Sequence, residues 1–345
     1  MLQNRLTYTQ TSSTLAMDER LKRGIDMNIQ TIKEHVLSGE DVTREEALFL
    51  VDADLLELQQ AADEIRRTFC GDSFDMCAVL SVRGGRCSEN CKYCSQSSCS
   101  TAEVPQFATR DADFVREDAK SHAHMGISHY CQVASGRKMG SSDIDKVCEN
   151  VRQITTHTDL APCVSLGLLT KEDLLRLKAA GVKRIHNNLE TSRRYFPSVC
   201  TSHTYDEKIE VLKAANEVGL ELCSGGIFGI GETWEDRIDL ALEVRKYHPT
   251  SVPINLLHPV KGTPMGDYPV LGEEELARII AIFRFLIPKA YIRLAAGRNY
   301  LEDTGIACFQ GGCNASITGD MVTVRGVSIE QDLKNIEAIG YHLGA

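Results

Sequence analysis

Residues 76–94 read MCAVLSVRGGRCSENCKYC, a short apolar run that leads into a loop with three cysteines. The run at 76–82 has the length and composition of a buried strand. Similar runs follow it along the chain, at 130–134, 163–168, 184–189, 221–228, 252–257, 291–295 and 315–318. Amphipathic stretches between them predict helices at 143–156, 171–179, 206–218, 236–247 and 273–286. The chain from residue 71 therefore alternates strands and helices.

This alternation predicts an α/β fold in which right-handed crossovers join parallel strands. The number of strands over residues 71–345 matches a (β/α)8 TIM-type barrel. A doubly wound open sheet is the alternative, but no GxGxxG motif follows the first strand, and GIGETW at 229–234 lacks the last glycine. Residues 1–70 predict an N-terminal helical extension, because Thr43 and Glu46 form a capping box before a periodic segment at 47–69.

Length and charge narrow the class of protein. The 345 residues suffice for one large domain or two smaller ones, and the net charge of −10 argues against a nucleic-acid partner or an anionic membrane surface. Residues 1–20 lack the apolar core of a secretory signal, and Arg278 and Arg284 interrupt the apolar stretch at 276–288. We therefore expect a cytoplasmic protein without a membrane span. In that reducing compartment the 13 cysteines should be thiols or metal ligands.

The loop cysteines Cys87, Cys91 and Cys94 are spaced so that their thiolates can converge on one metal centre. A structural zinc site needs a fourth ligand, and the spacing differs from that of ferredoxins. A four-iron cluster held by three cysteines leaves one iron open for a substrate or cofactor. The alternatives are a zinc loop with a distant fourth ligand such as Cys99, or three unrelated buried thiols.

Cys131, Cys163 and Cys223 each fall inside a predicted strand. Inward positions at a similar height on barrel strands form a layer, so these thiols can share a second iron–sulfur cluster below the first. Arg293 also lies in a predicted strand, where a buried guanidinium needs anionic or acceptor partners. The alternatives are ordinary core cysteines and an outward-facing arginine paired with a helix acid.

The CxxxCxxC spacing, with Tyr93 before the last cysteine, is similar to the signature of the radical S-adenosylmethionine superfamily. From about residue 71 onward, further motifs are similar to the biotin synthase family. They are CSENCKYCSQS (87–97), NLETS (188–192), CSGGIFGIGET (223–233), SVPIN (251–255), GTP (262–264) and RLAAGR (293–298). The resemblance implies an enzyme, a radical S-adenosylmethionine sulfurtransferase. Its family inserts sulfur into dethiobiotin after hydrogen abstraction by 5′-deoxyadenosyl radicals.

The same resemblance implies cofactors and partners. A [4Fe-4S] cluster on Cys87, Cys91 and Cys94 is expected to bind S-adenosylmethionine at its open iron. An auxiliary iron–sulfur cluster, of the [2Fe-2S] or a four-iron type, is expected to donate the sulfur. We further expect electrons from a flavodoxin- or ferredoxin-type protein, and a homodimer.

The resemblance also implies residue roles. It assigns the auxiliary cluster and the catalytic sulfur-donor site to Cys131, Cys163, Cys223 and Arg293. It assigns the S-adenosylmethionine site to Tyr93, Asn188, Glu190 and Lys208, and the substrate site to Asn188 and Asn255. Lys208 and His129 stand where family members have arginine, and a lysine keeps the charge but loses the bidentate fork.

The remaining inferences are less specific. Arg325 follows the last predicted strand at the mouth of the barrel, where it can bind the substrate carboxylate; a solvated arginine is the alternative. Cys77 is a further neighbour of the auxiliary site. Cys308 and Cys313, at the eighth predicted strand, are expected to be core thiols, and no role is assigned to Cys70, Cys99, Cys148 and Cys200. Other functions stay open: a maturase-type radical S-adenosylmethionine enzyme on the same barrel, or a non-catalytic metal- or redox-sensing barrel.

Overall fold

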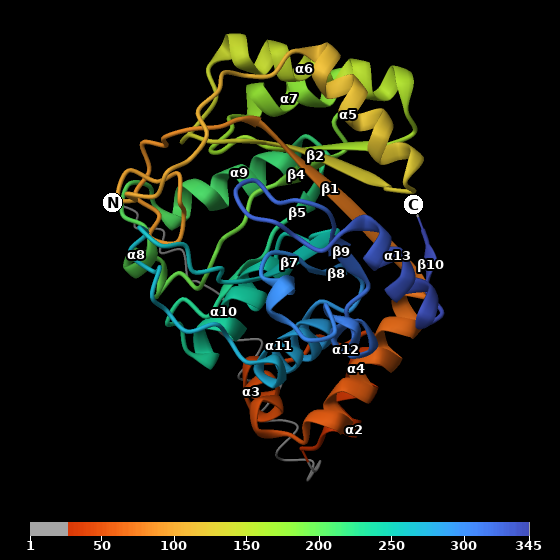
Figure 1. Cartoon of the computed structure of the whole chain (residues 1–345). Helices are drawn as coiled ribbons and strands as arrows, with labels where there is room; N and C mark the ends of the chain where they lie inside the picture. The colour runs from red at the N-terminus through yellow and green to blue at the C-terminus, as the bar shows by residue number, and fades with distance from the viewer. Residues whose placement is uncertain (1–26, 345) are drawn as a thin grey trace, which may run out of the picture.

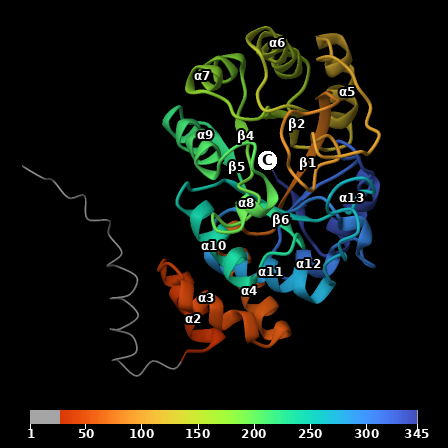
Figure 2. The ribbon, with the colours of Figure 1, turned by 90° about the vertical axis from the view of Figure 1, so that its left-hand side faces the viewer.

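The computed structural model describes residues 27–344 and contains a closed parallel barrel (Figures 1 and 2). Its wall follows the strand order β1-β2-β3-β4-β5-β7-β8-β9, and pairing of β1 with β9 closes the ring. The strands are β1 (Ser73–Arg83), β2 (His129–Ala134), β3 (Ala161–Ser165), β4 (Arg184–His186), β5 (Glu221–Cys223), β6 (Gly226–Phe228), β7 (Ser251–Leu256), β8 (Tyr291–Leu294) and β9 (Ala315–Ile317). The predicted (β/α)8 barrel is confirmed, and the open sheet is excluded.

The strand register sets which side chains lie at one level. Cys131 pairs directly with Cys163 across β2 and β3, and His186 pairs with Cys223 across β4 and β5. All the pairings in the wall are parallel, so neighbouring strands deliver their carboxyl ends to the same face. The loops that follow these ends form the mouth of the barrel.

The run at 221–228, expected as one strand, is split into β5 and β6. Both pieces pair with β7, and the backbone bends between them at Gly225 and Gly226. A Cβ atom on Gly225 would lie 2.1 Å from the Pro253 carbonyl oxygen, so only glycine permits this approach. A further short strand, β10 (His342–Leu343), was not predicted; it pairs with the start of β1.

Helices surround the barrel on the outside. They are α5 (Ala112–His124), α6 (Ser141–His157), α7 (Lys171–Ala180), α8 (Phe196–Val199), α9 (Tyr205–Glu217), α10 (Trp234–Arg245), α11 (Glu273–Leu286), α12 (Ile306–Gln310) and α13 (Ile329–Ala338), with a 3₁₀ turn, η2, at Arg298–Tyr300. Capping boxes begin α7, α9 and α10. Within residues 27–344, no helix is long and apolar enough to cross a membrane.

The N-terminal part packs helices on the outside of the barrel, against α10 and α11 (Figure 1). These helices are α2 (Ile29–Ser38), α3 (Arg44–Phe49), the 3₁₀ turn η1 (Leu50–Asp52) and α4 (Leu55–Cys70). The capping box of Thr43 and Glu46 is confirmed. The periodic segment at 47–69 is divided between helices, because Asp54 caps a new helix by accepting from the backbone N–H of Glu57. Residues 1–26 of the expected extension lie outside the described residues, and the division at residue 70 stays a prediction.

Candidate functional site

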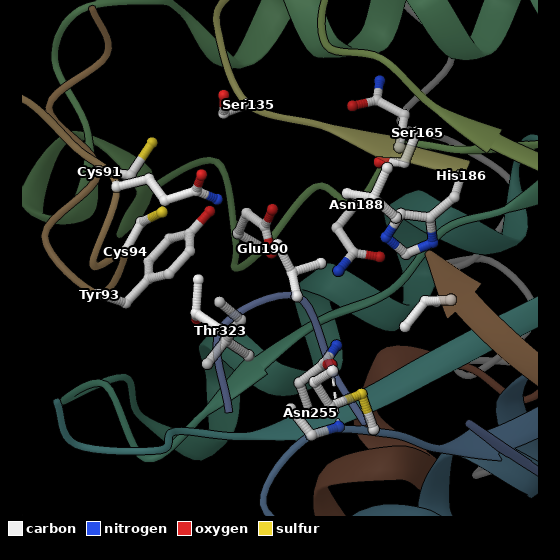
Figure 3. A pocket seen from close by; sticks show the side chains of 18 of the residues that line it. Cys91, Tyr93, Cys94, Ser135, Ser165, His186, Asn188, Glu190, Asn255 and Thr323 are labelled. Atoms are coloured by element: carbon white, nitrogen blue, oxygen red, sulfur yellow. Dashed lines mark hydrogen bonds between the residues drawn. The ribbon is translucent and has the colours of Figure 1, made fainter. Parts of the chain in front are cut away.

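A cavity of about 440 Å³ leads from the loops at the mouth of the barrel into its interior. Both cysteine sets that the sequence singled out line this space, and Figure 3 shows polar side chains of its wall beside two of the loop cysteines. The predicted residues on its wall are Cys87, Cys91, Tyr93, Cys94, Cys131, Cys163, Asn188, Glu190, Lys208, Cys223, Asn255 and Arg293. The structure therefore brings together residues that are up to about 200 positions apart in the chain, which supports one composite site.

The three-cysteine loop forms the outer end of the cavity. Backbone hydrogen bonds close it, from the Cys87 N–H to the Gln96 carbonyl (2.7 Å) and from the Cys94 N–H to the Cys91 carbonyl (3.2 Å). The Glu89 N–H also donates to the Cys87 sulfur (3.4 Å). All three cysteines are free thiols, and burial raises the pKa of Cys94. Clustered thiols of this kind become stable thiolates when a metal supplies the balancing positive charge.

The inner end of the cavity holds a second set of thiols. Cys131 and Cys163 pack against Cys77 of β1, which the sequence had marked only as a neighbour. Cys223 faces the same space, and its sulfur lies 3.4 Å from His186 Nδ1. Burial works against ionisation of Cys223, but the positive charge of His186 and two arginines outweighs it and lowers the pKa of this thiol to about 7.

Asp75, which the sequence analysis missed, is the anionic centre beneath this thiol set. Its carboxylate accepts hydrogen bonds from Arg293 and from His129 (2.7 Å), and Arg184 lies 3.3 Å away. Burial opposes the charged form, but the charge of Arg293, followed by the bonds to His129 and Arg184, holds the pKa of Asp75 well below its usual range. The signal was present in the sequence, because both Asp75 and Arg184 stand at strand starts where an inward charge needs a partner.

Most of the guanidinium N–H groups of Arg293 donate to acceptors within the protein. It donates to Ser251 Oγ (3.0 Å), to the Ser316 carbonyl (2.7 Å) and to both the carbonyl and the carboxylate of Asp75. One Nη2 hydrogen stays free of these acceptors. The counter-charge expected from a cluster is therefore already supplied by Asp75.

A polar belt lies between the two thiol sets. Lys208 Nζ donates to the Asn188 carbonyl (2.8 Å) and lies 3.7 Å from Glu190 Oε1. Glu190 adopts φ = 71°, a left-handed conformation that is unusual for a residue with a side chain, and its Oε2 atom is buried without a hydrogen-bond partner. Burial, followed by the negative charge of Glu190, raises the pKa of Tyr93, whose ring points toward it in Figure 3. A strained backbone with an unsatisfied carboxylate is typical of a ligand site.

Asn255 and the segment at 321–324 line the remaining wall. The Asn255 amide donates to the Gly226 carbonyl (3.0 Å) and accepts from the Ala296 N–H (3.3 Å), which fixes its orientation. Thr323 lies on the side of the three-cysteine loop, where its Oγ1 accepts from Ser95 Oγ (3.3 Å). Arg325 is exposed and is not part of the cavity wall, so the structure does not bring this predicted substrate residue to the site.

Two known families match separate parts of this chain. Residues 81–244 match the Radical SAM superfamily, and residues 253–342 match the Biotin and Thiamin Synthesis associated domain. A biotin synthase of Brachyspira hyodysenteriae is 45% identical over 92% of this chain and 96% of its own length. The chain belongs to the biotin synthase family. A biotin synthase of Akkermansia muciniphila is 46% identical over 89% of the chain and 96% of its own length.

Solved structures agree on the architecture of this biotin synthase family member. Methylornithine synthase (PylB) superposes with a TM-score of 0.79 at 18% identity, over 91% of this chain and 97% of that one. The hydrogenase maturase HydG gives the same TM-score at 17% identity, over 96% and 78%. At this identity the likeness concerns the fold alone. The predicted family, fold and enzyme class are confirmed, and membership implies a [4Fe-4S] cluster with S-adenosylmethionine.

Proposed function

We propose that this enzyme inserts one sulfur atom into dethiobiotin and so forms biotin. The observation that carries the proposal is the single cavity that joins the three-cysteine loop to the inner thiol set. One set alone would suit many radical S-adenosylmethionine enzymes. A second buried thiol set that shares its space suits a reaction in which the substrate needs both a radical and a sulfur atom.

The loop fits a four-iron cluster with one open iron. Cys87, Cys91 and Cys94 are the ligands, and the unsatisfied Glu190 carboxylate opposite them is a partner for the amino group of S-adenosylmethionine. Bound there, cluster and cofactor supply the hydrogen-abstracting radical, and the auxiliary cluster supplies the sulfur. The apolar side chains of Val133, Ile227 and the neighbouring wall keep water away from this space.

Lys208, Asn188 and Tyr93 complete the proposed cofactor site. Lys208 anchors the Asn188 backbone and places a positive charge beside Glu190, so it can pair with a cofactor carboxylate as a point charge. The Asn188 side chain accepts from the Gly225 N–H (3.0 Å), which holds the amide at the edge of the cavity. The Tyr93 ring forms part of the cavity wall at the three-cysteine loop.

The inner thiols fit the auxiliary cluster. Cys131, Cys163 and Cys223 keep their proposed roles as ligands, and Cys77 supplies a fourth thiol that packs against Cys131 and Cys163. A ligand shell with four thiols suits a two-iron and a four-iron cluster equally. Arg293 and Asp75 form an ion pair at its floor, and Arg293 lines the cavity with the thiols.

The substrate fits the space between Asn255 and residues 321–324. The Asn255 amide has one hydrogen and one lone pair left after its backbone contacts, and a cyclic urea needs both an acceptor and a donor. The proposed contact of Arg325 with the substrate carboxylate requires movement of its exposed side chain. A flavodoxin- or ferredoxin-type reductant, a homodimer and a cytoplasmic location complete the proposal.

The direct test is anaerobic incubation of the reconstituted enzyme with dethiobiotin, S-adenosylmethionine and a reductant. We expect a product that has gained one sulfur and lost two hydrogens, detected by mass spectrometry, together with 5′-deoxyadenosine. Formation of 5′-deoxyadenosine with dethiobiotin unchanged would assign the chain to a different radical reaction. A colourless protein with zinc and no cofactor cleavage would favour a non-catalytic barrel.

A further inference from the structure

A second group of ligating atoms lies behind the three-cysteine loop, outside the inner thiol set. Cys91 Sγ lies 3.6 Å from Cys200 Sγ, and the His203 ring nitrogens Nδ1 and Nε2 lie 3.3 and 3.9 Å from that sulfur. One ligand atom from each of these three residues falls within 4.8 Å of the other two. Cys200 ends α8, and His203 lies in the turn before α9. The proposed function uses only Cys91 among them.

The spacing fits a tetrahedral metal ion. Zinc binds thiolate sulfur at about 2.3 Å and imidazole nitrogen at about 2.0–2.1 Å, so its tetrahedral ligand atoms lie roughly 3.5–3.8 Å apart. The sulfur–sulfur distance of 3.6 Å falls in this range, and the Cys200 Sγ to His203 Nε2 distance of 3.9 Å nearly reaches it.

His203 is held as a metal ligand would be. Its Nδ1–H donates to Glu89 Oε2 (2.6 Å), because a carboxylate there can only accept. Ser202 Oγ and Arg137 Nη1 also donate to that oxygen, at 2.8 and 3.2 Å, which fixes the carboxylate. A histidine that gives one N–H to a carboxylate presents its other nitrogen as a lone pair, the usual arrangement around zinc.

We propose that, before the four-iron cluster is built, Cys91, Cys200 and His203 bind one borderline-soft divalent ion such as zinc or ferrous iron. Binding replaces the protons of the two thiols with the metal, releases both protons to solvent and leaves a fourth position to water. Cys91 cannot serve this ion and the cluster together, so the two sites exclude each other. The inference rests on the proposed function in one respect only, namely that Cys91 is a ligand of the four-iron cluster.

The first test counts zinc. The full-length chain is prepared anaerobically without iron, equilibrated with zinc chloride against a chelator, and analysed for bound zinc per chain. We expect Cys200→Ser and His203→Gln each to bind one zinc ion fewer than the original chain, or to bind that ion at least tenfold more weakly. Zinc bound by the inner thiols should be the same in all these chains. The matched control His157→Gln changes an exposed histidine at the end of α6 and should equal the original chain. Equal zinc binding by Cys200→Ser and the original chain would overturn the inference.

The second test separates this inference from the proposed function. The reduced four-iron cluster is followed by electron paramagnetic resonance during reconstitution, with and without prior zinc. We expect zinc to slow assembly in the original chain and to have far less effect in Cys200→Ser. Assembly in zinc-free buffer tests whether each chain can form the four-iron cluster at all. If Cys200→Ser fails to assemble the cluster in zinc-free buffer, Cys200 serves the cluster directly and the separate metal site is refuted.

Discussion

Cys131 on β2 and Cys163 on β3 are direct register partners, so their side chains leave the barrel wall side by side at one level. Both are buried, and Cys77 of β1 packs against them. Adjacent parallel strands place inward residues in layers, and here two neighbouring strands contribute thiols where branched apolar side chains are usual.

Replacement of Cys163 by alanine should separate the two proposed clusters. We expect Cys163→Ala to retain the loop cluster and S-adenosylmethionine cleavage, and to lose auxiliary iron and sulfide together with biotin formation. Iron and sulfide analysis, with product analysis, checks this. Cys148→Ala is the control, because that buried thiol belongs to α6 and contacts the Arg176 carbonyl (3.7 Å). Normal biotin yield from Cys163→Ala would remove Cys163 from the sulfur-donor site.

Replacement of Cys91 by alanine should abolish cofactor cleavage. The loop would then offer two thiolates, too few to hold a four-iron cluster in its open-iron form. The measurement is 5′-deoxyadenosine formation by chromatography. The control is Cys99→Ala, an exposed cysteine just after the loop, which should cleave S-adenosylmethionine normally. Cleavage by Cys91→Ala at the original rate would refute the proposed loop cluster.

Loss of the Lys208 ammonium should weaken cofactor binding. Lys208→Met removes the bond to the Asn188 carbonyl and the charge beside Glu190. We expect roughly tenfold weaker binding of S-adenosylmethionine, which corresponds to about 1.4 kcal/mol, by equilibrium dialysis. Lys208→Arg restores the charge and should recover most of the affinity. Equal affinity of the methionine variant would place the cofactor elsewhere.

Asp75 should matter for stability as well as for the site. Asp75→Ala leaves buried Arg293 and Arg184 without their shared anion. Breaking a buried pair from one side costs about 3–5 kcal/mol of the free energy of unfolding, measured by urea denaturation under anaerobic conditions. The control Asp145→Ala breaks an exposed pair with Arg176 and should cost less than about 1 kcal/mol. Similar losses in the two variants would contradict the assigned role of Asp75.

A pH-dependent contribution is expected from His122 on α5. Its hydrogen bond with Asp118 outweighs the effect of burial and raises the pKa of His122. A raised pKa stabilises the fold below the unfolded-state pKa of about 6.5, and the stabilisation disappears as pH rises through the folded-state pKa. His122→Gln should therefore destabilise the protein by on the order of 1 kcal/mol at pH 5.5 and by less at pH 9. A loss that does not change with pH would contradict this assignment.

The barrel could be predicted from the sequence because each strand appears as a separate apolar run with an amphipathic stretch after it. The split of β5 and β6 could not, since it depends on the approach of Pro253 to Gly225, a contact between distant segments. The cysteine spacing around Cys91 indicated a metal loop directly. The spacing gave no sign of Cys200, which lies 109 positions later and meets Cys91 only after α8 packs beneath the loop.

The residues at the floor of the site could likewise be predicted only in part from the sequence. Sequence reasoning expected buried Arg293 to need an anion and assigned that role to a cluster, whereas Asp75 of another strand provides it. Arg325 was placed at the mouth from its position after the last strand, but its side chain is exposed and does not line the cavity. Side-chain direction in a loop depends on tertiary packing, which a local pattern does not contain.

The central claim is that the inner thiol set supplies the sulfur that enters the substrate. The most direct measurement reconstitutes the enzyme with sulfide carrying a heavy sulfur isotope, removes free sulfide, and analyses biotin from a single turnover by mass spectrometry. The account predicts heavy sulfur in the biotin formed by the original chain. For Cys163→Ala it predicts that no biotin forms, and therefore that no labelled product appears. Biotin that contains only light sulfur would contradict it.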